Sequence, residues 1–113
     1  MTVELRYYQT AAGGQPFAEW LGGLPDKQAR ARIQARLARV AECNFGDVKP
    51  VGEGVLELRI DWGPGYRVYF AQVGNVIVLL LCGGDKRTQQ RDIKRAKDYF
   101  EDYQRRTAQK RGA

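Results

Sequence analysis

Two arginines in the segment LRIDWGPGYRVYF (residues 58–70) are spaced so that a β-hairpin would hold them side by side. Apolar and polar residues alternate on both sides of the loop DWGPG, which is typical of two antiparallel strands. With five residues in the loop, Arg59 lies opposite Arg67 on the same face of the sheet. Two neighbouring guanidinium groups suit the non-bridging oxygens of a phosphodiester. The alternative is a solvated ion network, in which Glu57 and Asp61 pair with the arginines.

A second candidate site is the segment CGGDKRTQQRDI (residues 82–93), which joins an apolar run to a charged amphipathic stretch. Its two glycines allow a ligand to approach the backbone, and Lys86 comes just before a predicted helix whose free N–H groups attract anions. Thr88 is suited to cap that helix. These features indicate a phosphate cradle, although the GxxxxGKS/T pattern of nucleoside triphosphate sites is missing. The alternative is an ordinary strand-to-helix turn, with Asp92 stabilising the first helical turn.

Tyrosines near these basic residues are candidates for stacking on unpaired bases, as in proteins that bind single-stranded RNA. Alternation assigns Tyr66 to the core, and helical spacing with apolar neighbours assigns Tyr103 there as well. Tyr69 and Tyr99 remain as stacking candidates. The basic faces of the second and last predicted helices are most simply solvated surface, with nucleic acid or an acidic protein as the second interpretation.

The composition indicates one small basic domain spanning residues 1–113. Its formal charge of +6 and pI near 9.6 favour a polyanion, an acidic protein or an anionic membrane surface as partner. The absence of histidine and serine excludes Ser-His and Cys-His dyads and HExxH zinc sites. No residue cluster has metal-ligand spacing, so we expect neither a metal nor another cofactor. The longest apolar stretch is far shorter than the about 20 residues of a membrane-spanning helix, and no signal peptide is visible, so we expect a cytoplasmic protein without membrane contact.

The periodicity of the apolar residues predicts the order β-α-α-β-β-β-α, which is that of an α+β domain. In the first strand Val3, Leu5 and Tyr7 are expected on the buried face and Tyr8 on the other. The last residues, 107–113, are expected to fray. The expected bounds are 2–8, 55–60, 66–73 and 76–82 for the strands and 25–43 and 88–106 for the longer helices, with a short helix from Pro16 and a polar loop at 44–54.

These elements would position the arginine pair on an open surface. The apolar run at residues 76–81 does not alternate, which predicts a strand covered on both faces. Around the hairpin, however, the sheet face opposite the two N-terminal helices is predicted to be open. Glu57 and Tyr69 would lie there beside Arg59 and Arg67.

The segments GVLELRIDWGPGYRVYF and LLLCGGDKRTQQRDIKRAKDY, in this order and spacing, resemble the RelE/ParE toxin superfamily. Within it they are most similar to the HigB-like addiction module killer group, which is related to phage host-inhibition proteins. The resemblance implies a curved antiparallel sheet packed against an N-terminal strand and helical pair. It also implies a cognate antitoxin as partner, which we expect to be a helix-turn-helix protein. RelE-like and HigB-like members cut messenger RNA, usually on the ribosome, whereas ParE-like members poison gyrase.

The resemblance also implies roles for individual positions. Arg67 in GYRVYF stands where RelE-like enzymes have a catalytic arginine, Lys86 in GGDK is close to a basic position at the end of the last strand, and Arg59 fills a basic sheet position. The match is looser for Gln89 and Tyr99. The most active RelE members have a lysine pair before the sheet arginine, where this chain has Glu-Leu, so the general base stays open. The candidates for catalysis are Arg59, Arg67, Lys86, Tyr99 and Glu57. The candidates for RNA binding are Tyr69, Gln89, Arg87, Lys49 and Lys94.

The expected chemistry is metal-independent RNA cleavage, in which the substrate's own 2′-hydroxyl attacks the adjacent phosphate and leaves a 2′,3′-cyclic phosphate. The arginines would offset charge on the phosphoryl oxygens, Lys86 or Tyr99 would move the proton, and Glu57 is a rival base. We therefore expect a type II toxin that cleaves ribosome-bound mRNA. Two alternatives would use the same basic surface: a gyrase-poisoning toxin, and a non-enzymatic module that binds nucleic acid or protein.

Overall fold

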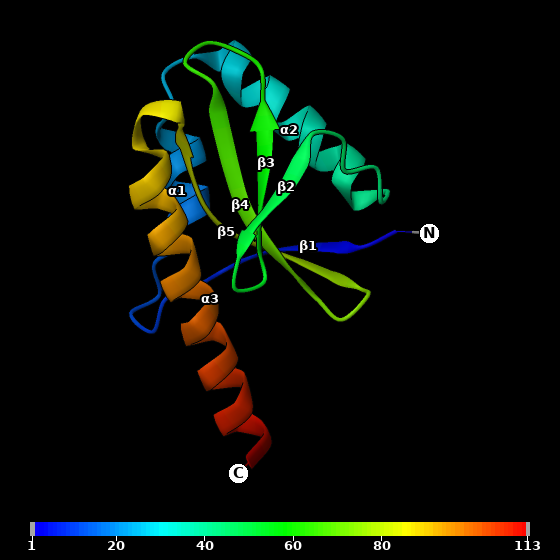
Figure 1. The fold of residues 1–113 in the computed structure, drawn as a ribbon, viewed down its shortest axis with the longest axis vertical. Helices are drawn as coiled ribbons and strands as arrows, with labels where there is room; N and C mark the ends of the chain where they lie inside the picture. Colours follow the sequence, from blue (N-terminus) through cyan, green and yellow to red (C-terminus); the bar gives the residue numbers. More distant parts are fainter. Residues whose placement is uncertain (1, 113) are drawn as a thin grey trace.

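A five-stranded sheet in the order β1-β5-β4-β3-β2 forms the centre of the structure (Figure 1). The structure is a computed structural model that describes residues 2–112. β1 pairs with β5 in parallel, and the other neighbouring strands are antiparallel, so the predicted α+β class is confirmed. In chain order the elements are β1 (Glu4–Tyr7), α1 (Pro16–Gly23), α2 (Lys27–Ala41), β2 (Val48–Gly52), β3 (Val55–Ile60), β4 (Tyr66–Val73), β5 (Ile77–Asp85), the 3₁₀ turn η1 (Lys86–Thr88) and α3 (Gln89–Gly112).

The segment predicted as a polar loop contains the edge strand β2, so the prediction of a loop at 44–54 is wrong. Pro50 is tolerated because an edge strand leaves one side of its backbone unpaired. A two-residue turn, Glu53-Gly54, then leads into β3 with positive φ at both positions, as a type I′ hairpin requires. The sheet therefore has one strand more than the sequence indicated.

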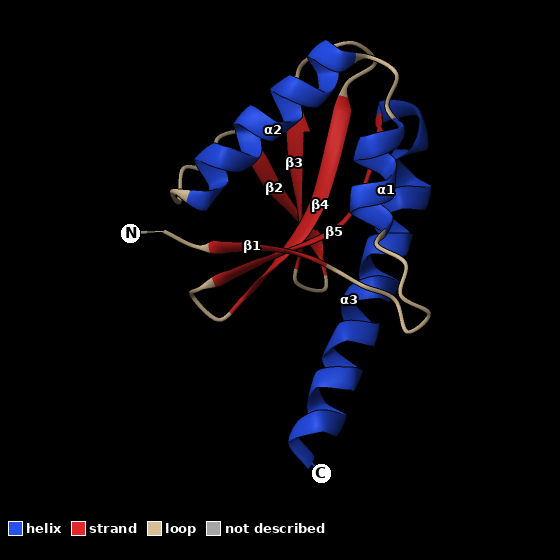
Figure 2. Ribbon diagram, turned by 180° about the vertical axis from the view of Figure 1, so that it is seen from behind, coloured by secondary structure: helices blue, strands red, loops and turns tan. Residues whose placement is uncertain are grey.

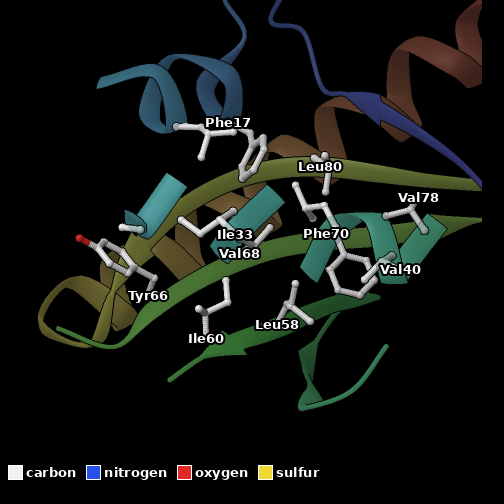
Figure 3. Packing of buried hydrophobic residues seen from close by; sticks show 13 residues of the cluster. Phe17, Ile33, Val40, Leu58, Ile60, Tyr66, Val68, Phe70, Val78 and Leu80 are labelled. Carbon is white, nitrogen blue, oxygen red and sulfur yellow. The ribbon is translucent and has the colours of Figure 1, made fainter. Parts of the chain in front are cut away.

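α1 and α2 cover one face of the sheet and enclose the larger apolar core (Figure 3). α2 begins after Asp26, whose carboxylate accepts hydrogen bonds from the backbone N–H groups of Gln28 (2.9 Å) and Ala29 (3.3 Å). The helix is shorter than predicted at both ends. Its predicted apolar stripe is buried, as expected: Ala29, Ile33, Leu37 and Val40.

α3 packs on the opposite face and encloses a second apolar core (Figure 2), so the prediction that this face is open is wrong for the part that α3 covers. β4 and β5 present Ala71, Leu79 and Leu81 to α3, and the helix contributes Ala96 and Phe100. An amphipathic helix of this length must bury its apolar stripe, and the second sheet face is the surface that accepts it. β5 is therefore covered on both faces, as its unbroken apolar run predicted.

β5 continues through the glycine pair that the sequence predicted would end it. A Cβ on Gly83 would lie 2.2 Å from Cε3 of Trp20, and a Cβ on Gly84 would lie 1.8 Å from Oδ2 of Asp92. The glycines thus let α1 and α3 pack directly on the strand backbone. Their function here is close packing rather than chain reversal.

Two further expectations are corrected at the ends of the chain. Tyr7 is exposed and Tyr8 is buried, the reverse of the prediction, because β1 ends at Tyr7 and the Tyr8 ring stacks on Tyr99 with 4.9 Å between ring centroids. Residues 107–112 continue α3 rather than fray, while residue 113 lies outside the described part.

Within residues 2–112, none of the helices has both the length and the hydropathy that crossing a membrane demands.

Candidate functional site

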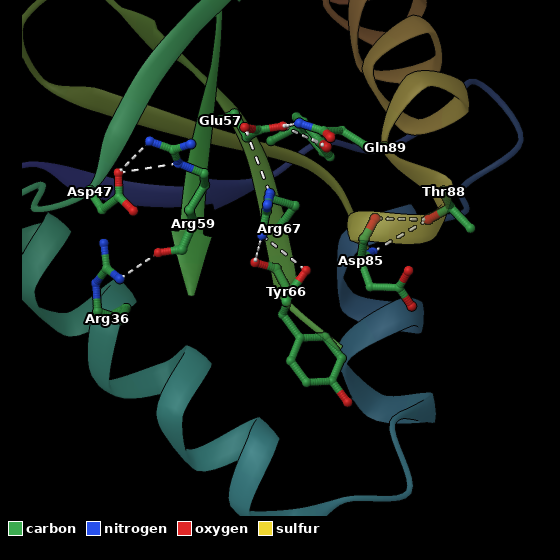
Figure 4. Close-up of polar contacts among 11 residues, drawn as sticks. Arg36, Asp47, Glu57, Arg59, Tyr66, Arg67, Asp85, Thr88 and Gln89 are labelled. Carbon is green, nitrogen blue, oxygen red and sulfur yellow. Dashed lines mark hydrogen bonds and ion pairs between the residues drawn. The ribbon is translucent and has the colours of Figure 1, made fainter. Parts of the chain in front are cut away.

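The hairpin register predicted from the sequence is confirmed, because Arg59 pairs with Arg67 across β3 and β4. The Arg59 side chain is 38% exposed, and Asp47 accepts hydrogen bonds from its Nε (3.2 Å) and Nη2 (2.9 Å) (Figure 4). On α2, Arg36 donates from Nη1 to the carbonyl oxygen of Arg59 at 2.7 Å. Arg59 is therefore fixed at its backbone by α2 and at its guanidinium by Asp47.

Arg67 is held more tightly and is largely buried. Its Nη1 donates to the carbonyl oxygens of Gly65 (3.0 Å) and Tyr66 (3.3 Å). Its Nε lies 3.7 Å from Oε1 of Glu57, an ion pair without a hydrogen bond, and neither of these two buried atoms has a hydrogen-bond partner. The arginine side chain is only 12% exposed, so a ligand can reach just part of its guanidinium.

Glu57 lies behind Arg67 and is fully buried. Its Oε2 accepts hydrogen bonds from the Tyr69 hydroxyl (3.0 Å) and from Nε2 of Gln89 (2.8 Å) (Figure 4). The structure therefore does not support Glu57 as a general base that contacts substrate. Gln89 joins the first turn of α3 to β3, so its predicted RNA contact is not supported either.

Tyr69 is also fully buried, so the prediction that it stacks on bases is wrong. Burial, followed by the charge of Glu57, raises the pKa of the Tyr69 hydroxyl above its ordinary value. The hydroxyl therefore stays protonated and donates its hydrogen bond to Glu57. Alternation correctly assigned Tyr69 to the arginine face, but α3 covers that part of the face.

A hollow of about 480 Å³ brings together three of the predicted basic residues. Arg59 comes from β3, Arg67 from β4 and Lys86 from η1, and the pairing of Tyr66 with Asp85 brings η1 beside the hairpin. The rest of the lining is Asp47, Asp61 and the loop residues Gly63, Pro64 and Gly65. The lining thus carries three cations from separate segments and two carboxylates, an excess of positive charge that favours an anion.

The predicted phosphate cradle at the start of the last helix is already occupied by a side chain of the protein. The Asp85 carboxylate accepts from the Arg87 backbone N–H at 2.8 Å, and Thr88 completes a capping box with it. A hydrogen bond from the Arg87 side chain lowers the pKa of Asp85. Arg87 is exposed and neighbours Lys86, but its guanidinium pairs with Asp85 rather than facing the hollow as a free cation.

The remaining candidates lie away from the hollow. Tyr99 accepts a hydrogen bond from Nη2 of Arg95 at 3.3 Å and lines a different cavity, between α1 and α3. Lys94 is exposed on α3, and Lys49 is exposed on β2 at the position paired with Glu57. Sequence reasoning missed Asp47 and Arg36 as partners of Arg59, because both contacts join segments that no local pattern relates.

Within residues 2–112, no group of three or more cysteine, aspartate or glutamate residues is arranged to hold a metal ion. The charged groups around the hollow are the hydrogen-bond donors Arg59, Arg67 and Lys86 and two separate carboxylates, Asp47 and Asp61. The arrangement can bind an anion, orient it against a fixed guanidinium, and offer an exposed ammonium group that carries transferable protons.

Comparison with known proteins assigns most of the chain to a family. Residues 19–101, which include every basic residue of the hollow, match the family described as phage-derived protein Gp49-like (DUF891). A protein of Haemophilus influenzae described as "Uncharacterized protein" is 48% identical over 97 residues, which cover 86% of this chain and 92% of that protein. The chain therefore belongs to the Gp49-like family of phage-derived proteins.

Proposed function

We propose that this protein is the toxin of a type II toxin–antitoxin module and that it cleaves messenger RNA on the ribosome. The observation that carries the proposal is the convergence of Arg59, Arg67 and Lys86 on one hollow. A phosphodiester is the anion that suits two guanidinium groups and an ammonium group. Membership of a phage-derived family and the resemblance to HigB-like toxins support the same function.

In the proposed reaction the 2′-oxygen of a nucleotide bonds to the adjacent phosphorus, and the bond from phosphorus to the 5′-oxygen breaks. The products are a 2′,3′-cyclic phosphate and a 5′-hydroxyl. Arg59 and the accessible part of Arg67 offset the negative charge that develops on the phosphoryl oxygens. Lys86 donates a proton to the departing 5′-oxygen, and the 2′-hydroxyl proton passes to water. The ribosome supplies much of the alignment by holding the mRNA.

Lys86 is proposed as the donor of the proton to the departing 5′-oxygen because of its position. Of the other two candidates, Glu57 is buried behind Arg67, and Tyr99 lines another cavity. Lys86 is exposed at the rim of the hollow and has rotatable donors. A cognate antitoxin, proposed to be a helix-turn-helix protein, would inhibit by laying an acidic segment over the hollow. The proposed site of action is the cytoplasm, where translated mRNA is found.

The test is to express the wild type and Lys86→Ala under tight induction and to map new 5′-hydroxyl ends in cellular mRNA. We expect the wild type to arrest growth and create such ends inside translated regions. Lys86→Ala should reduce their frequency by about 100-fold or more, because a positioned proton donor contributes on that scale. Lys27→Ala removes an exposed lysine at the start of α2 and should cleave like the wild type.

Lys86→Arg separates charge from proton transfer, because arginine binds phosphate but does not release its proton. Cleavage that remains low in Lys86→Arg supports Lys86 as the proton donor, whereas full activity leaves it a charge contact only. Growth arrest by the wild type without new mRNA ends contradicts the nuclease proposal and favours a gyrase-type protein target. Expression without arrest favours a non-toxic binding module.

A further inference from the structure

α2 carries an unusual excess of positive charge. The helix has five basic residues and no acidic residue between positions 27 and 41. Arg32, Arg36 and Arg39 follow one another at spacings of four and three, so they form one narrow stripe. Within residues 2–112 none of these three arginines forms a salt bridge. Burial, and after it the charge of Arg39, lower the pKa of Arg36, while the charge of Asp47 acts in the opposite direction.

This stripe lines a second hollow, of about 240 Å³, directly beside the first. The second hollow is lined by Arg32, Ala35, Arg36, Arg39, Ile60 and Asp61. Asp61 lines both hollows, and the hydrogen bond from Arg36 to the Arg59 carbonyl joins their walls. The basic residues of α2 therefore lie next to those of the first hollow, with the carboxylate of Asp61 between the two groups.

Trp62 holds one end of this stripe in place. The guanidinium carbon of Arg32 lies 3.8 Å from the centre of the Trp62 ring, and Nε1 of Trp62 donates to Oδ2 of Asp26 at 3.4 Å. A guanidinium stacked on an indole keeps its edge free for hydrogen bonds to a phosphate. Arg32 is therefore oriented before any ligand binds.

We propose that Arg32 and Arg39 on α2 bind the phosphate backbone of the same RNA strand whose scissile phosphate enters the hollow of Arg59, Arg67 and Lys86. This inference rests on the proposed function and extends the site along the strand. Arg32 and Arg39 are seven residues apart, about two helical turns or roughly 10.5 Å along the helix axis, so they can contact different phosphates of one extended strand. An acidic protein segment is the less favoured occupant of the second hollow, because only Ala35 and Ile60 give it apolar lining in which a protein anchor could be seated.

The test measures binding of 2′-O-methyl RNA, which lacks the attacking hydroxyl, as fluorescein-labelled oligonucleotides of 4 and 12 nucleotides. Fluorescence anisotropy gives the affinity of each between 50 and 200 mM salt. Arg39→Gln should weaken the 12-mer at least threefold and lower the magnitude of its salt slope by about 0.7, the value for one phosphate contact on a single strand. Binding of the 4-mer, which spans fewer phosphates, should weaken less than binding of the 12-mer. Arg32→Gln should behave in the same way.

Lys27→Gln is the matched control, because it removes one charge from the same helix but does not line either hollow. Equal weakening of the 12-mer by Lys27→Gln and Arg39→Gln would overturn the inference, since net charge alone would then explain the binding. Unchanged 12-mer binding in both arginine variants, with binding of both oligonucleotides lost in Lys86→Ala, would overturn it and leave the proposed function intact. Failure of the wild type to bind either oligonucleotide would overturn the inference, whereas the mapping of mRNA ends in cells decides the proposed function separately. Thermal midpoints within about 2 °C of the wild type establish that each variant is folded.

Discussion

At the scale of single residues, the two arginines that face each other across β3 and β4 have carboxylate partners in opposite environments. Arg59 pairs with Asp47, whose side chain is 56% exposed, whereas Arg67 faces the fully buried Glu57. Water screens an exposed pair, but a buried charge that loses its partner is costly. Two like charges are tolerated side by side because each arginine has its own carboxylate.

This difference predicts unequal effects from two chemically matched substitutions. We expect Glu57→Gln to lower the free energy of unfolding by about 3 kcal/mol, because Arg67 would keep a largely buried charge without a counter-charge. Asp47→Asn removes a carboxylate from the exposed pair and should cost less than about 1 kcal/mol. Urea denaturation at pH 7 compares the two variants. Equal losses would mean that Glu57 does not compensate the charge of Arg67.

The sequence could predict the arginine register but not the burial of the groups around it. Loop length and alternation together determine which residues pair across a hairpin, so Arg59 and Arg67 were found. Alternation also assigned Glu57 and Tyr69 to the same face. It cannot indicate how far a helix from another part of the chain extends over that face, and this is why both were expected to be accessible.

At the scale of secondary-structure elements, β5 depends on having no side chains at Gly83 and Gly84. Trp20 of α1 packs against Gly83, and Asp92 of α3 packs against Gly84. The strand therefore lies between two helices at a separation that any Cβ would enlarge. The same packing brings η1, and with it Lys86, to the rim of the arginine hollow.

Alanine substitutions at glycines of different environment test this close packing. Gly83→Ala should lower the free energy of unfolding by about 2 kcal/mol or more, because the new Cβ would overlap the Trp20 ring and force the helix outward. Gly22→Ala, in α1 with nothing within 4 Å of the new Cβ, should be neutral or stabilising by up to about 1 kcal/mol. Thermal and urea denaturation measure both. A Gly83→Ala protein as stable as Gly22→Ala would contradict the packing argument.

Sequence reasoning missed β2 and the end of α3 because neither segment has a pattern of apolar residues. β2 contains Pro50 and polar residues because an edge strand forms hydrogen bonds on one side only, so it lacks the signature of a buried strand. α3 reaches beyond residue 106 although its last residues are polar. By contrast, the stripe of α2 and the apolar run of β5 were predictable, since strong periodicity and continuous burial leave clear patterns.

At the scale of the whole molecule, α3 connects the sheet with the segment that follows β1. Its first turn is held by Gln89 and Asp92, whereas its later turns contact the segment that follows β1 and extend past the sheet (Figure 1). There the Tyr8 hydroxyl donates to Asp102, and Arg106 donates to the same carboxylate and to the carbonyl oxygen of Gln9. The segment after β1 and the last helix therefore depend on one carboxylate.

That dependence predicts a loss of stability in acid. The hydrogen bond from Tyr8 and the neighbouring Arg106 lower the pKa of Asp102 in the folded protein, below the about 3.9 of an unfolded chain. Above about pH 5 the carboxylate is ionised in both states, and its contribution to stability is complete. As the pH falls further, the unfolded chain takes up the proton first, so stability declines toward the folded pKa. Urea midpoints at pH 6 and pH 3 should therefore differ less in Asp102→Asn than in the wild type. The same difference in both proteins would show that other carboxylates, Asp85 among them, govern the acid response.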